Sequence, residues 1–369
     1  MFLFFLIKAP KNFLKLIKEN LLIKILIIFF FFQSISILVA YSITDFLKKY
    51  IDSFYYLIFF INGLLIFKKK EERDYLNFFK IIFFVTIINI IFKIFIYLDF
   101  EKFSYLFSDW INSAYINLIK ANLDRGRLYF SSFDEASFPV ILYLFFLEKN
   151  IISKILYFCF TILIILTTIL TNFRTIFFML IFSIFGSLLI FYQKFNYKSL
   201  ILFIVFILII FLNINFIKSL SYETVIDRLI LDETQSISLI SRIEQIKSSF
   251  DIALKSFLGV GLGNYYLYTN KKPHLYLNKE TKILTEESVN YPHNIFALIV
   301  SDAGFFALFA YLSFIFTIFK DDIKNFMTKK MEIKVLIISF WSLFFYCLFN
   351  PTDFYYYNIY FFGLRVFIL

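Results

Sequence analysis

The chain has 369 residues, of which 60% are hydrophobic and 58 are Phe, and its mean hydropathy is +0.78. No soluble core could bury that much apolar surface, so the composition excludes a soluble domain and indicates a polytopic membrane protein. The net charge of +10 does not indicate nucleic-acid binding, because the basic residues lie in short loops between apolar runs.

Ten apolar runs are candidates for membrane-spanning helices. They cover residues 21–40, 53–67, 78–98, 136–147, 151–170, 174–192, 199–217, 293–319, 335–349 and 354–369. The runs at 53–67 and 136–147 are the weakest candidates, because a helix needs about 20 apolar residues to cross a bilayer unaided. No A-x-A cleavage pattern follows the first run, which predicts an uncleaved span rather than a signal peptide.

The basic residues follow the positive-inside rule if both chain ends are cytoplasmic. The turns at 171–173 and 350–353, placed outside, carry no Lys or Arg, and the turn predicted at 41–52 has only Lys48 and Lys49. Removing the doubtful span at 136–147 would place every later lysine cluster outside. The inside loops carry Lys68, Lys69, Lys70, Arg73, Lys149, Lys154, Lys194, Lys198, Lys320, Lys324, Lys329, Lys330 and Lys334.

Two long segments then fall on the outer, periplasmic face, at 99–135 and 218–292, and the longer one is mostly polar. No internal repeat or Pro/Ser-rich linker divides the chain. The simplest organisation is one transmembrane domain over residues 1–369 with a periplasmic loop insertion at 218–292.

The longer outer segment contains a predicted amphipathic helix. Apolar residues recur there at helical spacing, and Ser241 with Glu244 fits a capping box at its start. The stretch GVGLGN at 259–264 predicts a sharp turn that ends the helix. It is no phosphate loop, since no GK[ST] follows and no strand precedes it. The predicted apolar stripe consists of Ile243, Ile246, Phe250, Ala253, Leu254 and Phe257.

Ionisable residues suited to phosphate chemistry are predicted near the outer membrane–water boundary. Arginine holds phosphate oxygens with a fixed fork of donors, and a histidine could take a proton from a hydroxyl at neutral pH. A lipid-linked diphosphate would match this depth. The residues concerned are Arg125, Arg127, Arg174, Arg242 and His293.

Each candidate also has a structural interpretation. Arg174 could snorkel to the interface, Arg242 could be a solvated helix residue, and His293 could belong to a helix start that includes Pro292 and Asn294. Asp302 is interpreted as the one clear mid-span charge, which favours a functional role or a packing role against another helix.

The order of these features resembles the O-antigen polymerase/ligase superfamily of bacterial membrane glycosyltransferases. The resemblance covers roughly 125–320. It rests on TNFRT at 171–175, SRIEQIKSSFDIALKSFLGVGLGN at 241–264, His-Asn at 293–294 and DAG at 302–304. FDEASF at 133–138 looks like the F-x-E-P-S element of the polymerases, with Ala136 in place of proline, and Asn172-Phe173 departs from the small residues that often precede the arginine.

The resemblance implies an all-α polytopic membrane protein with a C-type glycosyltransferase fold in the bacterial inner membrane. It implies a glycan on undecaprenyl diphosphate as donor and no metal or other cofactor. The acceptor would be lipid-linked or lipid A–core, with a chain-length regulator as a further partner. Family members carry functional residues at the positions of His293, Arg242 and Arg174, the expected catalytic residues. Arg127, Arg125, Glu135, Asn294 and Asp302 are expected to bind substrate.

Three alternatives stay open. FDEASF favours a polymerase, and an O-antigen ligase would differ only in its acceptor. A lipid-linked oligosaccharide flippase would place charges in the middle of many spans and would show a repeated half-structure. A membrane scaffold without catalysis would not need arginines gathered at one depth.

Overall fold

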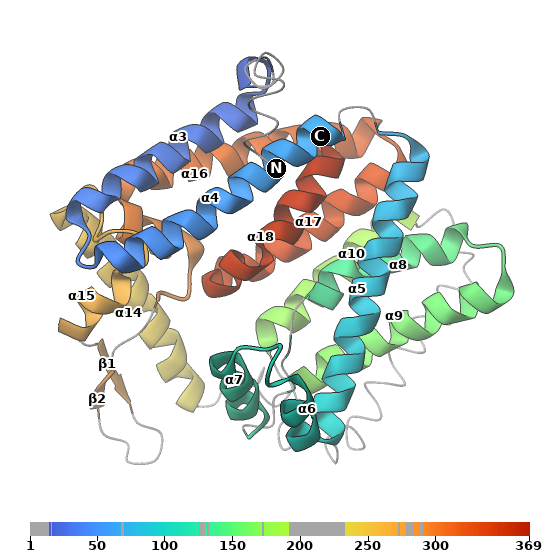
Figure 1. Ribbon diagram of the computed structural model, residues 1–369, viewed down its shortest axis with the longest axis horizontal. Coiled ribbons are helices and arrows are strands. Elements are labelled where there is room, and N and C mark those ends of the chain that lie inside the picture. Colours follow the sequence, from blue (N-terminus) through green and yellow to red (C-terminus); the bar gives the residue numbers. More distant parts are fainter. Residues whose placement is uncertain are drawn as a thin grey trace. The chain divides into compact units, whose positions relative to one another are not determined.

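Figure 1 shows a computed structural model of the chain. It describes residues 15, 17–67, 70–124, 128, 130, 133–171, 173–191, 233–271, 274–277, 284–287 and 291–369. Arg125, Arg127 and the predicted span at 199–217 lie outside the described residues, and the side chain of Arg174 is not described either.

The described part of the chain is helical apart from one antiparallel hairpin of β1 (His274–Leu277) and β2 (Leu284–Glu287). Among the described residues, six helical segments are long and apolar enough to cross a membrane, and each corresponds to a predicted run. The ten-span count and the sidedness of the loops stay predictions. The six segments are Leu21–Val39, Ile43–Ile66, Glu72–Leu98, Ile151–Thr171, Ile295–Thr328 and Met331–Phe349.

The chain divides into two compact units. The first comprises Met1–Lys69, Asp232–Lys329 and Cys347–Leu369, and the second comprises Lys70–Leu231 and Lys330–Tyr346. The first contains α3 (Leu21–Ile35), η1 (Ser36–Val39), α4 (Ile43–Ile66), α14 (Glu233–Lys255), α15 (Tyr265–Lys271), α16 (Ile295–Thr328), α18 (Pro351–Ile368) and the hairpin.

The first unit is built on two helix pairs, in which α3 packs along α16 and α4 packs along α18. Gly63 allows the second pair to approach closely, since a Cβ there would lie 2.6 Å from Val366 Cγ2. Arg365 of α18 is fully buried, and its Nη1 donates to both carboxylate oxygens of Asp322 in α16 at 2.7 Å. α14 and α15 lie at the N-terminal end of α16 (Figure 1).

The predicted turn at 41–52 is wrong, because α4 begins at Ile43. Ser42 caps this helix through a 3.2 Å bond from the Asp45 amide to its hydroxyl, and Asp45 in the first turn complements the helix dipole. The weak candidate at 53–67 is therefore the second half of a 24-residue helix.

The second unit gathers its helices around α8. It contains α5 (Glu72–Leu98), α6 (Phe100–Phe107), α7 (Ser113–Leu123), α8 (Phe133–Leu147), α9 (Ile151–Thr171), α10 (Arg174–Phe191) and nearly all of α17 (Met331–Phe349). α8 contacts α5, α9 and α10, and its 15 residues are almost all buried. The segment predicted to lie on the outer face at 99–135 contains α6 and α7, which pack through a cluster that includes Phe103 and Ile119.

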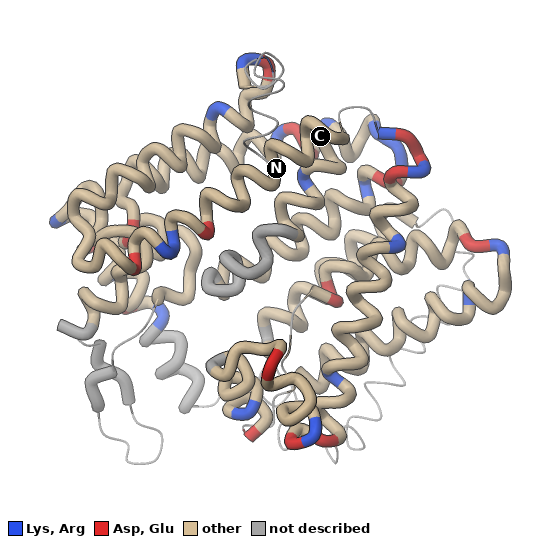
Figure 2. Tube along the Cα trace, in the orientation of Figure 1, with Lys and Arg blue, Asp and Glu red and all other residues tan. Residues whose placement is uncertain are grey.

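Charged residues gather mainly at helix ends and connections, with long uncharged stretches along the helices (Figure 2). The interpretation of Asp302 as the one clear mid-span charge is wrong, because Lys93 lies fully buried within α5. A single lysine in an apolar run is easily taken for a flanking residue when its partners, far along the chain, are not known.

Candidate functional site

His293 lies two residues before α16, at the junction with the loop segment. Its backbone N–H donates to Gln245 Oε1 of α14 at 3.2 Å, and its ring meets Tyr291 edge-on at 5.4 Å between centroids. Its Nδ1 is buried, and no hydrogen-bond partner reaches it from the described part of the chain. A buried imidazole nitrogen without a partner is costly in a folded protein, so it marks a candidate ligand contact.

Arg242 of α14 is half-buried and lies close enough to act electrostatically on His293. Burial, with the positive charge of Arg242 as the second cause, lowers the pKa of His293 from 6.5 to about 4. The imidazole is therefore neutral at physiological pH and can accept a hydrogen bond. The structure thus brings together two of the three predicted catalytic residues, although 51 positions separate them in the sequence.

Gln245 is a site residue that the sequence analysis missed. It is 4% exposed, and its side chain holds the backbone immediately at His293. It follows Arg242 by three positions, so both side chains lie on neighbouring positions of one helix surface. That spacing is the only signal in the sequence, and it does not distinguish Gln245 from other polar residues on the helix.

α14 itself differs from the prediction in two respects. It begins at Glu233, so Ser241 lies inside the helix and the predicted capping box at Ser241 and Glu244 is wrong. Among the side chains described on this helix, Gln245, Ser249, Ile252 and Ala253 are buried. Of the six residues of the predicted apolar stripe, Ala253 is buried, Ile246 and Phe250 are half-buried, and Ile243, Leu254 and Phe257 are exposed. Hydrophobic periodicity alone does not tell whether an apolar face meets protein or lipid, and this is why the predicted face is not the packed one.

The glycine turn after α14 interlocks with a break in α16. Val260 N donates to Ser301 O at 2.8 Å, and Phe305 N donates to Phe257 O at 3.2 Å. α16 is interrupted at Gly304, where φ is 79°, and a Cβ there would lie 1.9 Å from Phe257 O. Only glycine fits this crossing, so GVGLG and DAG form one packed joint that fixes the end of α14 on α16.

Asp302 belongs to this joint. Its Oδ2 accepts the Gly263 amide at 2.9 Å, and its side chain is 1% exposed. Asn264, which follows Gly263, extends the joint to the α3–α4 connection. Its Oδ1 accepts from Ser42 N at 2.6 Å, and its Nδ2 donates to Ser42 O at 3.3 Å. The geometry therefore assigns Asp302 a role in holding the turn, and leaves substrate binding by Asp302 as a hypothesis.

Asn294 is the N-cap of α16. Its Oδ1 accepts from Phe296 N at 2.9 Å and from Ala297 N at 3.0 Å. This is the helix-start interpretation that the sequence offered for Pro292 to Asn294, and it occupies the carboxamide oxygen. Substrate binding by Asn294 stays a prediction that would have to use its amide nitrogen.

Glu135 lies in a buried group of polar side chains in the second unit. Lys93 Nζ is 2.8 Å from Asp134 Oδ2 and 3.5 Å from Glu135 Oε1, and the Thr168 hydroxyl donates to Glu135 Oε1 at 2.9 Å. Asn89 donates to Asp134 as well. Lys93, Asp134 and Glu135 are 0% exposed, so the FDEASF element points into the protein core rather than a loop.

Arg174 is the first residue of α10, so the predicted helix start is confirmed, whereas a membrane span at this helix stays a prediction. It belongs to the second unit, whereas Arg242 and His293 belong to the first. Its part in a common site with them therefore stays a prediction, as do the parts of Arg125 and Arg127.

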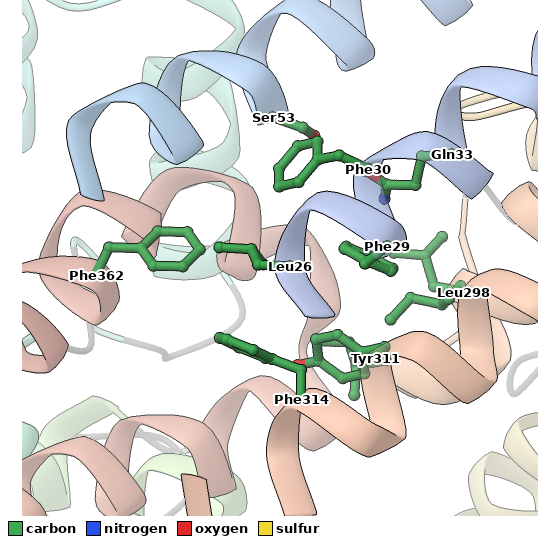
Figure 3. A pocket seen from close by; sticks show the side chains of 11 residues that line it. Leu26, Phe29, Phe30, Gln33, Ser53, Leu298, Tyr311, Phe314 and Phe362 are labelled. Atoms are coloured by element: carbon green, nitrogen blue, oxygen red, sulfur yellow. The ribbon is translucent and has the colours of Figure 1, made fainter. Parts of the chain in front are cut away.

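A pocket in the first unit lies among α3, α4, α16 and α18 (Figure 3). It holds about 40 Å³, and most of the side chains around it are apolar, with Gln33, Ser53 and Tyr311 as the polar ones. Ligand pockets occupy roughly 300–1,000 Å³. This space suits a few water-sized molecules and no sugar, and its lining includes neither Arg242 nor His293.

Comparisons with known proteins bear on the same residues. A sequence model of the family described as O-antigen ligase matches residues 159–312, a segment that contains Arg174, Arg242 and His293 but not Glu135. Neither the curated proteins nor the solved structures contain a match. The match supports membrane glycosyl transfer in polysaccharide biosynthesis as the broad activity. The match thus supports, over residues 159–312, the resemblance of the chain to the O-antigen polymerase/ligase superfamily.

Proposed function

We propose that the protein transfers a glycan from undecaprenyl diphosphate to an acceptor hydroxyl at the periplasmic face of the inner membrane. The observation that carries this proposal is the proximity of Arg242 to a neutral, half-buried His293 whose buried Nδ1 lacks a partner among the described residues. A diphosphate leaving group needs a fixed cation, and a hydroxyl nucleophile needs an acceptor for its proton. The pair offers both at one place.

In the proposed reaction the acceptor oxygen forms a bond to the anomeric carbon while the bond from that carbon to the diphosphate oxygen breaks. Arg242 stabilises the negative charge that grows on the departing diphosphate, an electrostatic role that is often the largest contribution to catalysis. Arg174 is proposed as a second cation for the same group. Fixed guanidinium donors suit this task because they match phosphate oxygens in pairs.

His293 accepts the hydrogen bond of the attacking hydroxyl through Nδ1. With a pKa of about 4 it is a weak base at neutral pH, so orientation of the nucleophile is its main role. The proton passes from the acceptor oxygen to Nδ1 of His293 only as the new bond to carbon makes the hydroxyl strongly acidic. Gln245 keeps the imidazole in place through the backbone of His293.

Polymerases and ligases of this superfamily differ in the acceptor that they use. We propose polymerisation of surface polysaccharide repeat units as the first candidate, because FDEASF at 133–138 resembles the polymerase element. The test is the surface glycan profile of a strain that lacks the protein. A single repeat unit on lipid A–core indicates a polymerase, and bare core with polymer left on undecaprenyl diphosphate indicates a ligase. A normal glycan in this strain would contradict both.

A flippase receives less support, although the buried charges within the helices number more than the sequence analysis recognised. Lys93 faces Asp134 and Glu135, and Arg365 faces Asp322, so these charges are engaged with one another. Charges that are engaged with one another in this way do not by themselves indicate a substrate path.

Sidedness is tested separately by accessibility of introduced cysteines. Ser108 and Asp251 are exposed and predicted to be periplasmic, whereas Lys329 is exposed and predicted to be cytoplasmic. An impermeant thiol reagent applied to cells with a permeabilised outer membrane should label Ser108→Cys and Asp251→Cys but not Lys329→Cys. The reverse pattern would contradict periplasmic chemistry.

A further inference from the structure

The surface of α14 divides into three lengthwise stripes. At 3.6 residues per turn, Gln245, Ser249 and Ile252 share the face that is buried against α16. The two other stripes face outward. The first, named the apolar stripe, consists of Ile243, Ile246, Phe250 and Leu254 on α14 together with Phe257 two residues beyond its end; Ile246 and Phe250 are half-buried and the other three are exposed. The second, named the charged stripe, consists of Glu244, Lys247, Asp251 and Lys255.

The apolar stripe is exposed to an extent that is unusual for a helix surrounded by water. Leu254 is 66% exposed and Phe257 is 62% exposed, and Ile243 at the other end is 44% exposed. An exposed row of large apolar side chains marks a contact surface. Its partner must be apolar as well.

The apolar stripe continues directly into the outward face of α16. The rings of Phe250 and Phe257 both lie against Phe305, at 6.3 and 6.0 Å between centroids. The next outward residues on α16, Phe306 and Phe309, are 50% and 62% exposed on a helix that is long and apolar enough to span the membrane. The exposed apolar surface of this candidate spanning helix is thus continuous with the exposed apolar residues of α14.

The charged stripe indicates how α14 is oriented. All four of its residues are exposed, and their two acidic and two basic side chains carry no net charge. An apolar stripe beside a charged stripe is the pattern of a helix that lies in the membrane interface, with one face in the acyl boundary and the other in water. Without a net positive charge, attraction to anionic lipid does not explain the contact, and burial of apolar area does.

We propose that α14 is an interfacial helix whose apolar stripe is immersed in the outer boundary of the bilayer, with lipid as its occupant. The contact holds Arg242 and His293 at the depth of lipid headgroups, where the diphosphate of a lipid-linked substrate lies. It requires no particular reaction. It therefore stands even if the proposed glycosyl transfer fails.

The test measures the surroundings of a spin label attached at single cysteines in the full protein, reconstituted in phospholipid vesicles. Cys159 and Cys347 are first replaced by serine and alanine. The apolar stripe is sampled with Leu254→Cys and Phe257→Cys. Lys247→Cys and Asp251→Cys on the charged stripe of the same helix are the matched controls. Each position is exposed, so labelling leaves the packed face intact, and a single symmetric peak in gel filtration confirms the fold.

Collisions with oxygen, which concentrates in lipid, are compared with collisions with a water-soluble nickel chelate. We expect a high oxygen-to-nickel ratio at 254 and 257 and a low ratio at 247 and 251. A low ratio at all four positions would overturn the proposal, because the helix would then lie in water. Weak collisions with both reagents at 254 and 257 would also overturn it, because the apolar stripe would then be covered by protein.

Discussion

Two groups of buried polar side chains differ in how their charges are compensated. Lys93 in the second unit faces two carboxylates, so its positive charge meets opposite charge in the core. In the first unit, His293 is half-buried beside Arg242, a cation that opposes its protonation. The first arrangement can be understood as packing alone. The second leaves an imidazole nitrogen without a partner among the described residues, and such an arrangement is maintained when it serves a ligand.

The largest effect is expected from a substitution of Lys93, which tests whether its group of charges is structural. Lys93→Met leaves Asp134 and Glu135 buried without their cation, which is expected to cost about 3–5 kcal/mol of stability. We expect little folded protein in detergent extracts, with a strongly lowered unfolding temperature. Normal yield and unfolding temperature would contradict the structural role.

The control for Lys93 removes the whole charged group. Lys93→Met combined with Asp134→Asn and Glu135→Gln leaves no buried charge, and most of the lost stability should return. If this variant folds and is active, Glu135 is a structural residue. If it folds without activity, the predicted role of Glu135 in substrate binding gains support.

For the His293–Arg242 pair we expect loss of activity without loss of folded protein. His293→Gln and Arg242→Ala should each lower glycan formation by about 10²–10⁴-fold at normal membrane levels, since each removes an interaction with the reacting groups. Arg242→Lys should restore only part of the activity, because a point charge does not reproduce the guanidinium fork. Full activity in both His293→Gln and Arg242→Ala would contradict the proposed site.

His274→Ala serves as the matched histidine control. His274 lies on β1, between the motifs at 241–264 and 293–294, and belongs to neither. We expect wild-type glycan formation from this variant. Strong loss would show that the assay reports loop stability rather than chemistry at His293.

Much of the helical framework could be predicted from hydropathy, because an apolar run of membrane length has few alternatives to a helix. Arg174 at a helix start and the sharp turn at Gly259 to Gly263 were also predictable, from local sequence. Local signals failed at Ser241, where a capping pattern occurs inside a helix that begins at Glu233. A capping pattern is short and occurs by chance, so it cannot exclude a longer helix.

The candidate site was predictable only in part. The resemblance singled out Arg242 and His293, but their pairing and the contact of Gln245 depend on how α14 packs on α16. The ion group of Lys93 was missed because Lys93 and Asp134 lie 41 positions apart, and no periodicity links them. Contacts between distant segments follow from tertiary packing, which a single sequence does not display.

A smaller effect is expected at Gln245, which acts on His293 through its backbone. Gln245→Leu removes the acceptor of the His293 amide and should lower activity about tenfold, the scale of losing one hydrogen bond of about 1 kcal/mol together with some orientation. The loss should appear in kcat more than in KM. Gln245→Glu keeps an acceptor and should retain more activity than Gln245→Leu; equal loss in both would contradict the positioning role.

The smallest expected effect is a shift in the pH profile, and it tests whether Arg242 and His293 interact. Because burial and Arg242 lower the pKa of His293 to about 4, kcat/KM should stay level from pH 7 to about 5 and fall only near pH 4. Arg242→Gln removes the second cause, so the acidic limb of its residual activity should move towards neutral pH. Arg242→Lys keeps the charge and should leave the limb near 4. The same pKa shift affects stability. The unfolded chain binds a proton at His293 near pH 6.5, whereas the folded chain binds it only near pH 4. The free energy of unfolding therefore declines as the pH falls from 6.5 to 4. An acidic limb near pH 6.5 in the unmodified protein would show an ordinary, solvated histidine, and the contrast between the two buried groups would then disappear.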